Sequence, residues 1–137
     1  MTDVKLRVTA TAALVVGLLT TAGCAMVGSG AACAAPEATI APESAAPEQS
    51  VTLSGRNWGV CNDTNHRFLP PWDHVNVRWV QSGEVIATGQ IPIDDGIDFR
   101  ITQSVPADAL PGDATVIITS PDDDPYEVSV PMTIEAP

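Results

Sequence analysis

The chain has little positive charge. It carries one lysine and five arginines against 17 aspartates and glutamates, which gives a formal net charge of −11 over 137 residues. Such a field repels nucleic-acid phosphates and anionic lipid head groups, so we expect no nucleic-acid partner. Cationic partners are compatible with this charge, and so is an acidic surface that has no specific partner.

The chain also lacks the motifs of common catalytic sites. It contains no Gly-x-Ser-x-Gly, no phosphate-binding glycine loop and no His-Glu-x-x-His. A folded part of about 87 residues buries too little surface to enclose a deep ligand cavity in addition to its core. We therefore expect no enzymatic activity and no cofactor.

A short apolar segment follows two basic residues near the N-terminus. Lys5 and Arg7 precede an uncharged run over 8–22, and Thr21-Ala22-Gly23-Cys24 closes it. This pattern resembles a bacterial lipoprotein signal peptide over residues 1–23. The resemblance implies cleavage before Cys24 and lipidation of that cysteine, whose two acyl chains would anchor the protein to the extracytoplasmic face of the cell membrane.

Two other interpretations of this segment stay open. Cleavage at a small-x-small site, around Cys24 or around Cys33, would release a secreted domain. The first charge after Arg7 is Glu37. An uncleaved helix that continues past Cys24 would therefore approach the roughly 20 residues that a membrane span needs.

Residues 24–49 have the composition of a linker. Ala-Pro-Glu occurs three times, beginning at Ala35, Ala41 and Ala46. Proline favours extended geometry and the like charges repel one another, so we expect a disordered linker between Cys24 and a folded domain over 50–136.

From Ser50 onward apolar residues alternate with polar ones, the period of a half-buried strand. Strands are expected at 51–54, 74–79, 85–91, 97–102, 114–119 and 126–135. In the last of them one side carries Tyr126, Val128, Val130, Met132 and Ile134. Pro131 has no amide hydrogen, so that strand should lie at an edge or carry a bulge there. Short strands separated by turn residues predict an all-β, antiparallel sandwich of about seven strands.

One run resembles a known family of domains. Val105-Pro106 through Pro111-Gly112 to Val116, with Asp95-Gly96 and Phe99 before it, is similar to a segment of bacterial immunoglobulin-like surface domains. Leu53, Gly55 and Trp58 are similar to the opening strand and turn of such modules. The resemblance implies an immunoglobulin-like β-sandwich with a spacer, adhesion or protein-interaction role, in which Trp79 would be the buried tryptophan of the third strand.

The segment 56–73 has no strand period and is the expected contact loop, because function concentrates in such loops. Trp58, Phe68 and Trp72 would form an aromatic patch for a protein or carbohydrate ligand if they are exposed together. The alternative for Trp58 is a place in the core.

A small metal-binding or redox-linked envelope protein is the competing class. Cys61, Asp63, His66 and His74 include the side-chain types that bind zinc or copper, but their spacing matches no structural zinc pattern, so we expect no metal. Aspartates at 94–98 and 122–124 offer oxygen ligands for calcium, but neither spacing is that of an EF-hand loop. We expect them to be turn formers.

If Cys24 is acylated, Cys33 and Cys61 remain in an oxidising compartment. They could form a disulfide that ties the linker to the loop. A free Cys61 that packs as a small apolar side chain is the alternative.

Overall fold

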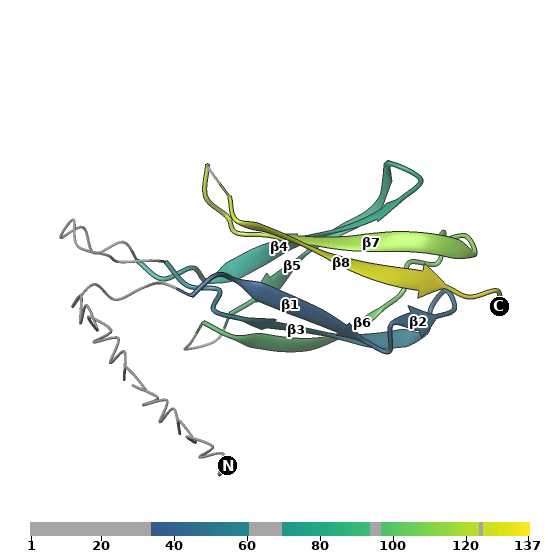
Figure 1. Cartoon of the computed structure of the whole chain (residues 1–137), viewed down its shortest axis with the longest axis horizontal. Helices are drawn as coiled ribbons and strands as arrows, with labels where there is room; N and C mark the ends of the chain where they lie inside the picture. The colour runs from purple at the N-terminus through teal and green to yellow at the C-terminus, as the bar shows by residue number, and fades with distance from the viewer. Residues whose placement is uncertain (1–33, 61–69, 94–96, 124) are drawn as a thin grey trace, which may run out of the picture.

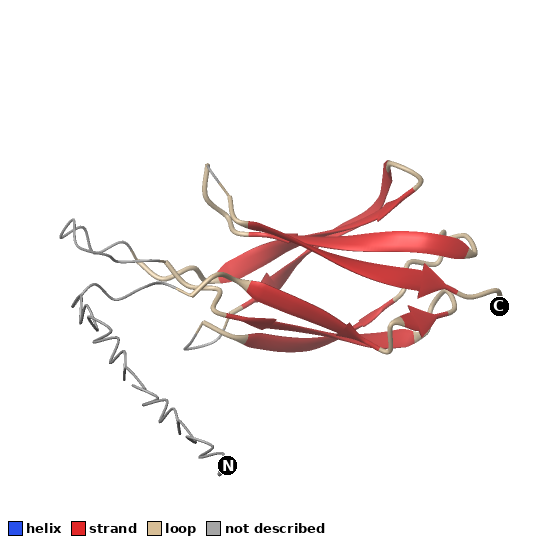
Figure 2. Ribbon diagram, viewed as in Figure 1, coloured by secondary structure: helices blue, strands red, loops and turns tan. Residues whose placement is uncertain are grey.

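The computed structural model describes residues 34–60, 70–93, 97–123 and 125–137, and every regular element in these ranges is a β-strand (Figures 1 and 2). The strands are β1 (Glu37–Ala41), β2 (Ser44–Ala45), β3 (Ser50–Arg56), β4 (His74–Gln81), β5 (Glu84–Pro92), β6 (Phe99–Ser104), β7 (Gly112–Thr119) and β8 (Glu127–Ile134).

The strands form two sheets that pack as two layers (Figure 1). One sheet has the order β1-β3-β6 and the other has the order β2-β8-β7-β4-β5. All neighbours are antiparallel except β2, which runs parallel to β8. The prediction of an all-β sandwich is confirmed.

The core follows the alternation of the sequence. On β4 every second residue is buried, and Trp79 at the centre of the larger sheet is among them. On β3, Val51 and Leu53 face the same interior while Thr52 and Ser54 face outward. Strand periodicity therefore fixes which side of each sheet faces the other layer.

The β4–β5 hairpin has a two-residue turn. Ser82 and Gly83 both adopt positive φ, 52° and 83°, and Gln81 pairs with Glu84 across the turn. Two positive φ values are the signature of the tight hairpin turn whose twist matches that of the strands.

The prediction of a disordered linker is wrong for residues 37–49. Strand β1 pairs with β3 over five positions, and Ile40 is buried in the core. After Pro42 the chain crosses to the other sheet, where β2 pairs with β8. The proline and glutamate content concealed Ala38-Thr39-Ile40, whose alternation suits an edge strand between two prolines. The folded domain thus begins about 13 residues before the predicted start at residue 50.

The edge position predicted for Pro131 is confirmed. Strand β2 pairs only with Thr133 and Ile134, so within the described chain Pro131 has a partner strand on one side, through Thr115 of β7. Thr133 N–H donates to the Glu43 carbonyl on the side of β2. Because directions alternate along a strand, residue 131 faces that same side, where a proline sacrifices no hydrogen bond within the sheet.

Candidate functional site

The long connections of the sandwich gather at one end. The segments 57–73, 93–98 and 120–126 all leave or enter their strands there, and the chain enters β1 at the same end (Figure 1). We call this the loop end. The contact segment predicted from the sequence belongs to this end. The packing of the loop end therefore determines which side chains of that segment are exposed for a contact.

Trp58 fixes the start of the connection between β3 and β4. Its side chain is fully buried, and its indole N–H donates to the Glu37 carbonyl at 2.8 Å. Its backbone N–H donates to the Ile97 carbonyl at 2.6 Å. The indole also packs against Phe99, with ring centroids 6.1 Å apart. Trp58 therefore joins three segments of the loop end.

Trp72 fixes the other end of the same connection. Only 8% of Trp72 is exposed, and its indole N–H donates to Asp122 Oδ1 at 3.1 Å. Its ring packs against Tyr126 at a centroid distance of 6.1 Å. The Tyr126 backbone N–H donates to the Ser120 hydroxyl, and the Ser120 backbone N–H donates to the Tyr126 carbonyl. The connection is thus attached to the β7–β8 turn as well as to β1.

The predicted aromatic patch is therefore wrong for two of its three members. Trp58 and Trp72 are core anchors, and Phe68 lies outside the described residues. Among the described residues of the loop end, the large apolar side chains that are exposed are Tyr126 and Ile97, each at 49%. The alternation placed both on core-facing sides, but β8 begins at Glu127 and β6 at Phe99, so each stands just before its strand.

The loop end is acidic. Asp73, Asp98, Asp122 and Asp123 belong to its three connections. The hydrogen bond with the His74 ring lowers the pKa of Asp73 from its usual value, which favours the charged carboxylate. Asp98 Oδ1 accepts a hydrogen bond from the Asn57 backbone N–H at 3.0 Å, and Asp122 Oδ1 accepts one from the Trp72 indole N–H. Both aspartates thus serve as structural acceptors, in agreement with their interpretation as turn residues.

Of the predicted metal and thiol residues, only His74 belongs to the described part of the chain. Cys24, Cys33, Cys61, Asp63 and His66 lie outside the described residues. His74 is described, and its Nδ1 contacts the Asp73 carboxylate. Within the described ranges no group of three or more His, Cys, Asp or Glu side chains lies close enough to hold a metal ion.

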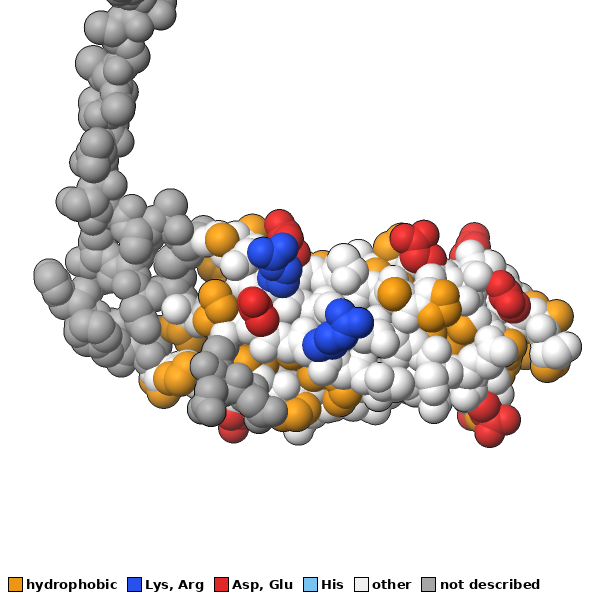
Figure 3. Space-filling model, turned by 90° about the horizontal axis from the view of Figure 1, so that it is seen from below, with side chains coloured by type: hydrophobic (Ala, Val, Ile, Leu, Met, Phe, Trp, Pro, Cys, Tyr) orange, Lys and Arg blue, Asp and Glu red, His pale blue; other side chains and the backbone are white. Residues whose placement is uncertain are grey.

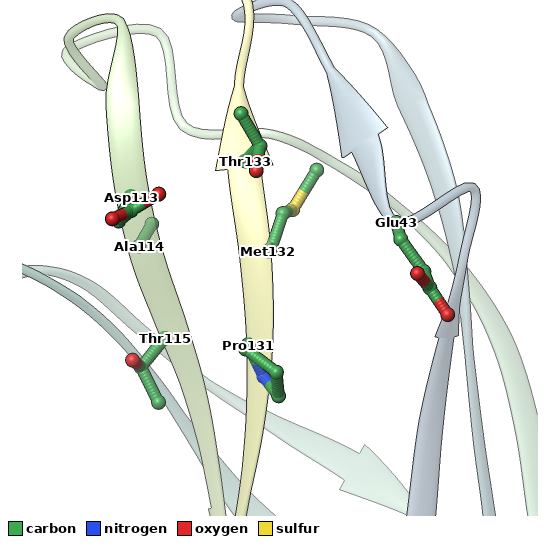
Figure 4. A pocket seen from close by; sticks show the side chains of 7 residues that line it. All are labelled: Glu43, Asp113, Ala114, Thr115, Pro131, Met132 and Thr133. Carbon is green, nitrogen blue, oxygen red and sulfur yellow. The ribbon is translucent and has the colours of Figure 1, made fainter.

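A second feature is a shallow hollow of about 330 Å³ over the β7–β8 end of the larger sheet (Figure 4). Glu43 and Asp113 line it together with Thr115, Pro131 and neighbouring residues. Figure 4 shows the two carboxylates on opposite sides of β8, with neither pointing toward the other. The hollow therefore does not present the facing pair of carboxyl groups that glycoside hydrolysis uses.

The outer face of the three-stranded sheet is largely uncharged. Its outward positions carry hydroxyl side chains at Thr39, Thr52, Ser54 and Thr102. Figure 3 shows basic side chains in two places on this face and carboxylates mostly toward its margins. No predicted site residue lies on this face, so Thr102 on it is a suitable control position for a contact at the loop end.

The sequence was compared with protein-family models and with curated proteins, and neither comparison gave a match. No helix in the described ranges is long and apolar enough to cross a membrane.

Proposed function

We propose that the chain is an extracytoplasmic immunoglobulin-like module, held at the cell membrane by a lipid on Cys24, whose loop end binds another protein. The main support for this proposal is that two buried tryptophans, Trp58 and Trp72, attach the two ends of the 57–73 connection to the sandwich. Tyr126 and Ile97, which contact these ends, are half exposed. Exposed aromatic and aliphatic side chains next to loop ends that the core holds in place are typical of protein–protein contacts.

The strand order supports the immunoglobulin-like assignment. Strands β8, β7, β4 and β5 correspond in order to G, F, C and C′ of that fold, and β3 with β6 corresponds to the B–E pair. Trp79 on β4 is buried, as expected for the tryptophan of strand C. The domain has no described counterpart of strand D, because the described parts of the β5–β6 connection contain no strand.

The charge of the loop end indicates the chemistry of the partner. The described parts of the connections carry Asp73, Asp98, Asp122 and Asp123, while the imidazole of His74 is already engaged by Asp73. A protein surface with basic residues around an apolar centre would complement this end, and its association rate would fall with increasing salt.

A photo-crosslinking aromatic amino acid at position 126, introduced in cells that express the full chain, tests the binding role. We expect a discrete adduct with an envelope protein at Tyr126 and none at the control position Thr102 on the three-stranded sheet. A spacer without a partner gives no adduct at either position, and equal labelling at both positions contradicts a specific loop-end site.

The anchor is tested by the mass of the protein recovered from membranes. We expect a chain that starts at Cys24 and carries a diglyceride and acyl chains, and we expect Cys24→Ser to abolish this modification. A secreted chain without lipid, or an unprocessed chain, would contradict the anchor while leaving the loop-end experiment interpretable.

A further inference from the structure

Strand β5 is the longest uncharged sheet edge of the described chain. It is nine residues long and the last strand of the larger sheet, and it carries no charge from Val85 to Pro92. The other edges are blunted by features that discourage pairing. Strand β1 is short and lies between Pro36 and Pro42, β8 carries Pro131, and β6 carries Arg100.

The free backbone groups of β5 can be assigned. The Ile93 N–H donates to the Asp73 carbonyl at 2.9 Å. From Ala87 to Ile93, beyond the register shift at Ile86, the odd-numbered residues therefore face β4. The pairs Val77–Gly89 and Val75–Ile91 continue this alternation. The N–H and C=O groups of Thr88 and Gln90 therefore point away from β4. Both residues are exposed, and so is Gly89 between them. Pro92 also points outward, where its missing N–H costs the sheet nothing.

We propose that β5 pairs with β5 of a second copy of this chain, antiparallel and about a two-fold axis at Gly89. In this register Thr88 faces Gln90 of the second copy, and each pair exchanges two backbone hydrogen bonds, which gives four in total. The arrangement is isologous, so it closes as a dimer and covers both free edges at once. The two larger sheets become one continuous sheet.

Charge limits where a second copy can approach this chain. Each chain has a net charge of −11, so two copies repel each other over most of their surfaces. Strand β5 has no charged side chain from Val85 to Pro92, so a second copy can approach along it without this repulsion. Glu84 lies five residues from Gly89, so at about 3.3 Å per residue the two Glu84 side chains lie on opposite sides of the axis, roughly 33 Å apart. This separation is several times the Debye length of about 8 Å at physiological salt.

The small contact predicts a weak dimer that depends on protein concentration and tightens with salt. The test places a photo-crosslinking amino acid at Gln90 of the purified full chain and maps the adducts by mass spectrometry. We expect an adduct of twice the chain mass that joins two β5 peptides. An equal yield from the control position Thr102 would indicate association through other segments and would overturn the proposal.

Thr88→Pro, added to the Gln90 crosslinker, removes one N–H per chain from the new pairing and none from the β4–β5 ladder. We expect the β5–β5 adduct to fall at least fivefold, while circular dichroism stays unchanged. If this variant does not fold, Gln90→Glu gives the answer by sedimentation velocity. It places two carboxylates near the axis, so the dimer should weaken at low salt and recover at high salt. An unaffected dimer or no adduct at all overturns the assignment.

Discussion

At the scale of single residues, the loop end depends on the contact between Gly55, Trp58 and Phe99. A Cβ on residue 55 would overlap the Phe99 ring and lie 2.7 Å from Trp58 Nε1, so only glycine fits between the rings. The sequence left Trp58 with two interpretations, an exposed contact or a core side chain. The structure decides between them through the indole N–H, whose acceptor is the Glu37 carbonyl. That acceptor could not be foreseen, because residue 37 belonged to the predicted linker.

Gly55→Ala should destabilise the domain by about 1–3 kcal/mol, because the added methyl group overpacks a site closed by two rings. Gly89→Ala is the matched control in another strand. Its Cβ meets only Val77 Cγ1 at 3.4 Å, so its effect should lie between neutral and about 1 kcal/mol of stabilisation. Urea unfolding of both full-length variants at low protein concentration measures the difference. Equal stabilities would show that residue 55 is not confined as described.

At the scale of elements, the six later strands could be predicted and the two earliest could not. Strands β3 to β8 fall on the alternating segments, because a strand with one buried face requires an apolar residue at every second position. Strand β1 has five residues and β2 has two, too few for a period to stand out among Ala-Pro-Glu repeats. Their pairing partners are distant in sequence, because β1 lies on β3 and β2 lies on β8. Composition alone does not contain that information.

Ile40→Ala tests whether β1 belongs to the fold. Ile40 is 5% exposed and packs in the common core, so its truncation should cost about 2–5 kcal/mol of unfolding free energy. Thr39→Ala on the same strand faces solvent and should change stability by less than about 0.5 kcal/mol. Urea denaturation of the two variants gives both values. If Ile40→Ala behaves like its exposed neighbour, residues 37–41 act as a linker after all.

At the scale of the whole molecule, the chain crosses from one sheet to the other between β1 and β2. Strand β1 starts at the loop end, and this crossing at the opposite end attaches the N-terminal segment to both layers (Figure 1). Near residue 35 the chain lies beside the start of the β3–β4 connection, where Asn57 Nδ2 donates to the Ala35 carbonyl at 3.3 Å. The sequence suggested a Cys33–Cys61 bridge from cysteine count and compartment alone, with a disordered segment at one end. The contact between residues 35 and 57 now supplies a geometric reason for the bridge.

Cys33 precedes Ala35 by two residues and Cys61 follows Asn57 by four. At no more than about 3.6 Å per residue, Cys33 stays within about 7 Å of Ala35 and Cys61 within about 14 Å of Asn57, so chain length permits them to meet. Closing a loop of 28 residues (61 − 33) should stabilise the domain by about 3–4 kcal/mol. We therefore expect protein recovered from the oxidising side of the membrane to lose about that much unfolding free energy when a reductant is added. Cys61→Ser should already show the lower value and should not respond to the reductant. Thiol labelling before and after reduction checks the bond directly, since equal labelling of the unfolded chain in both states would show that these two residues stay reduced.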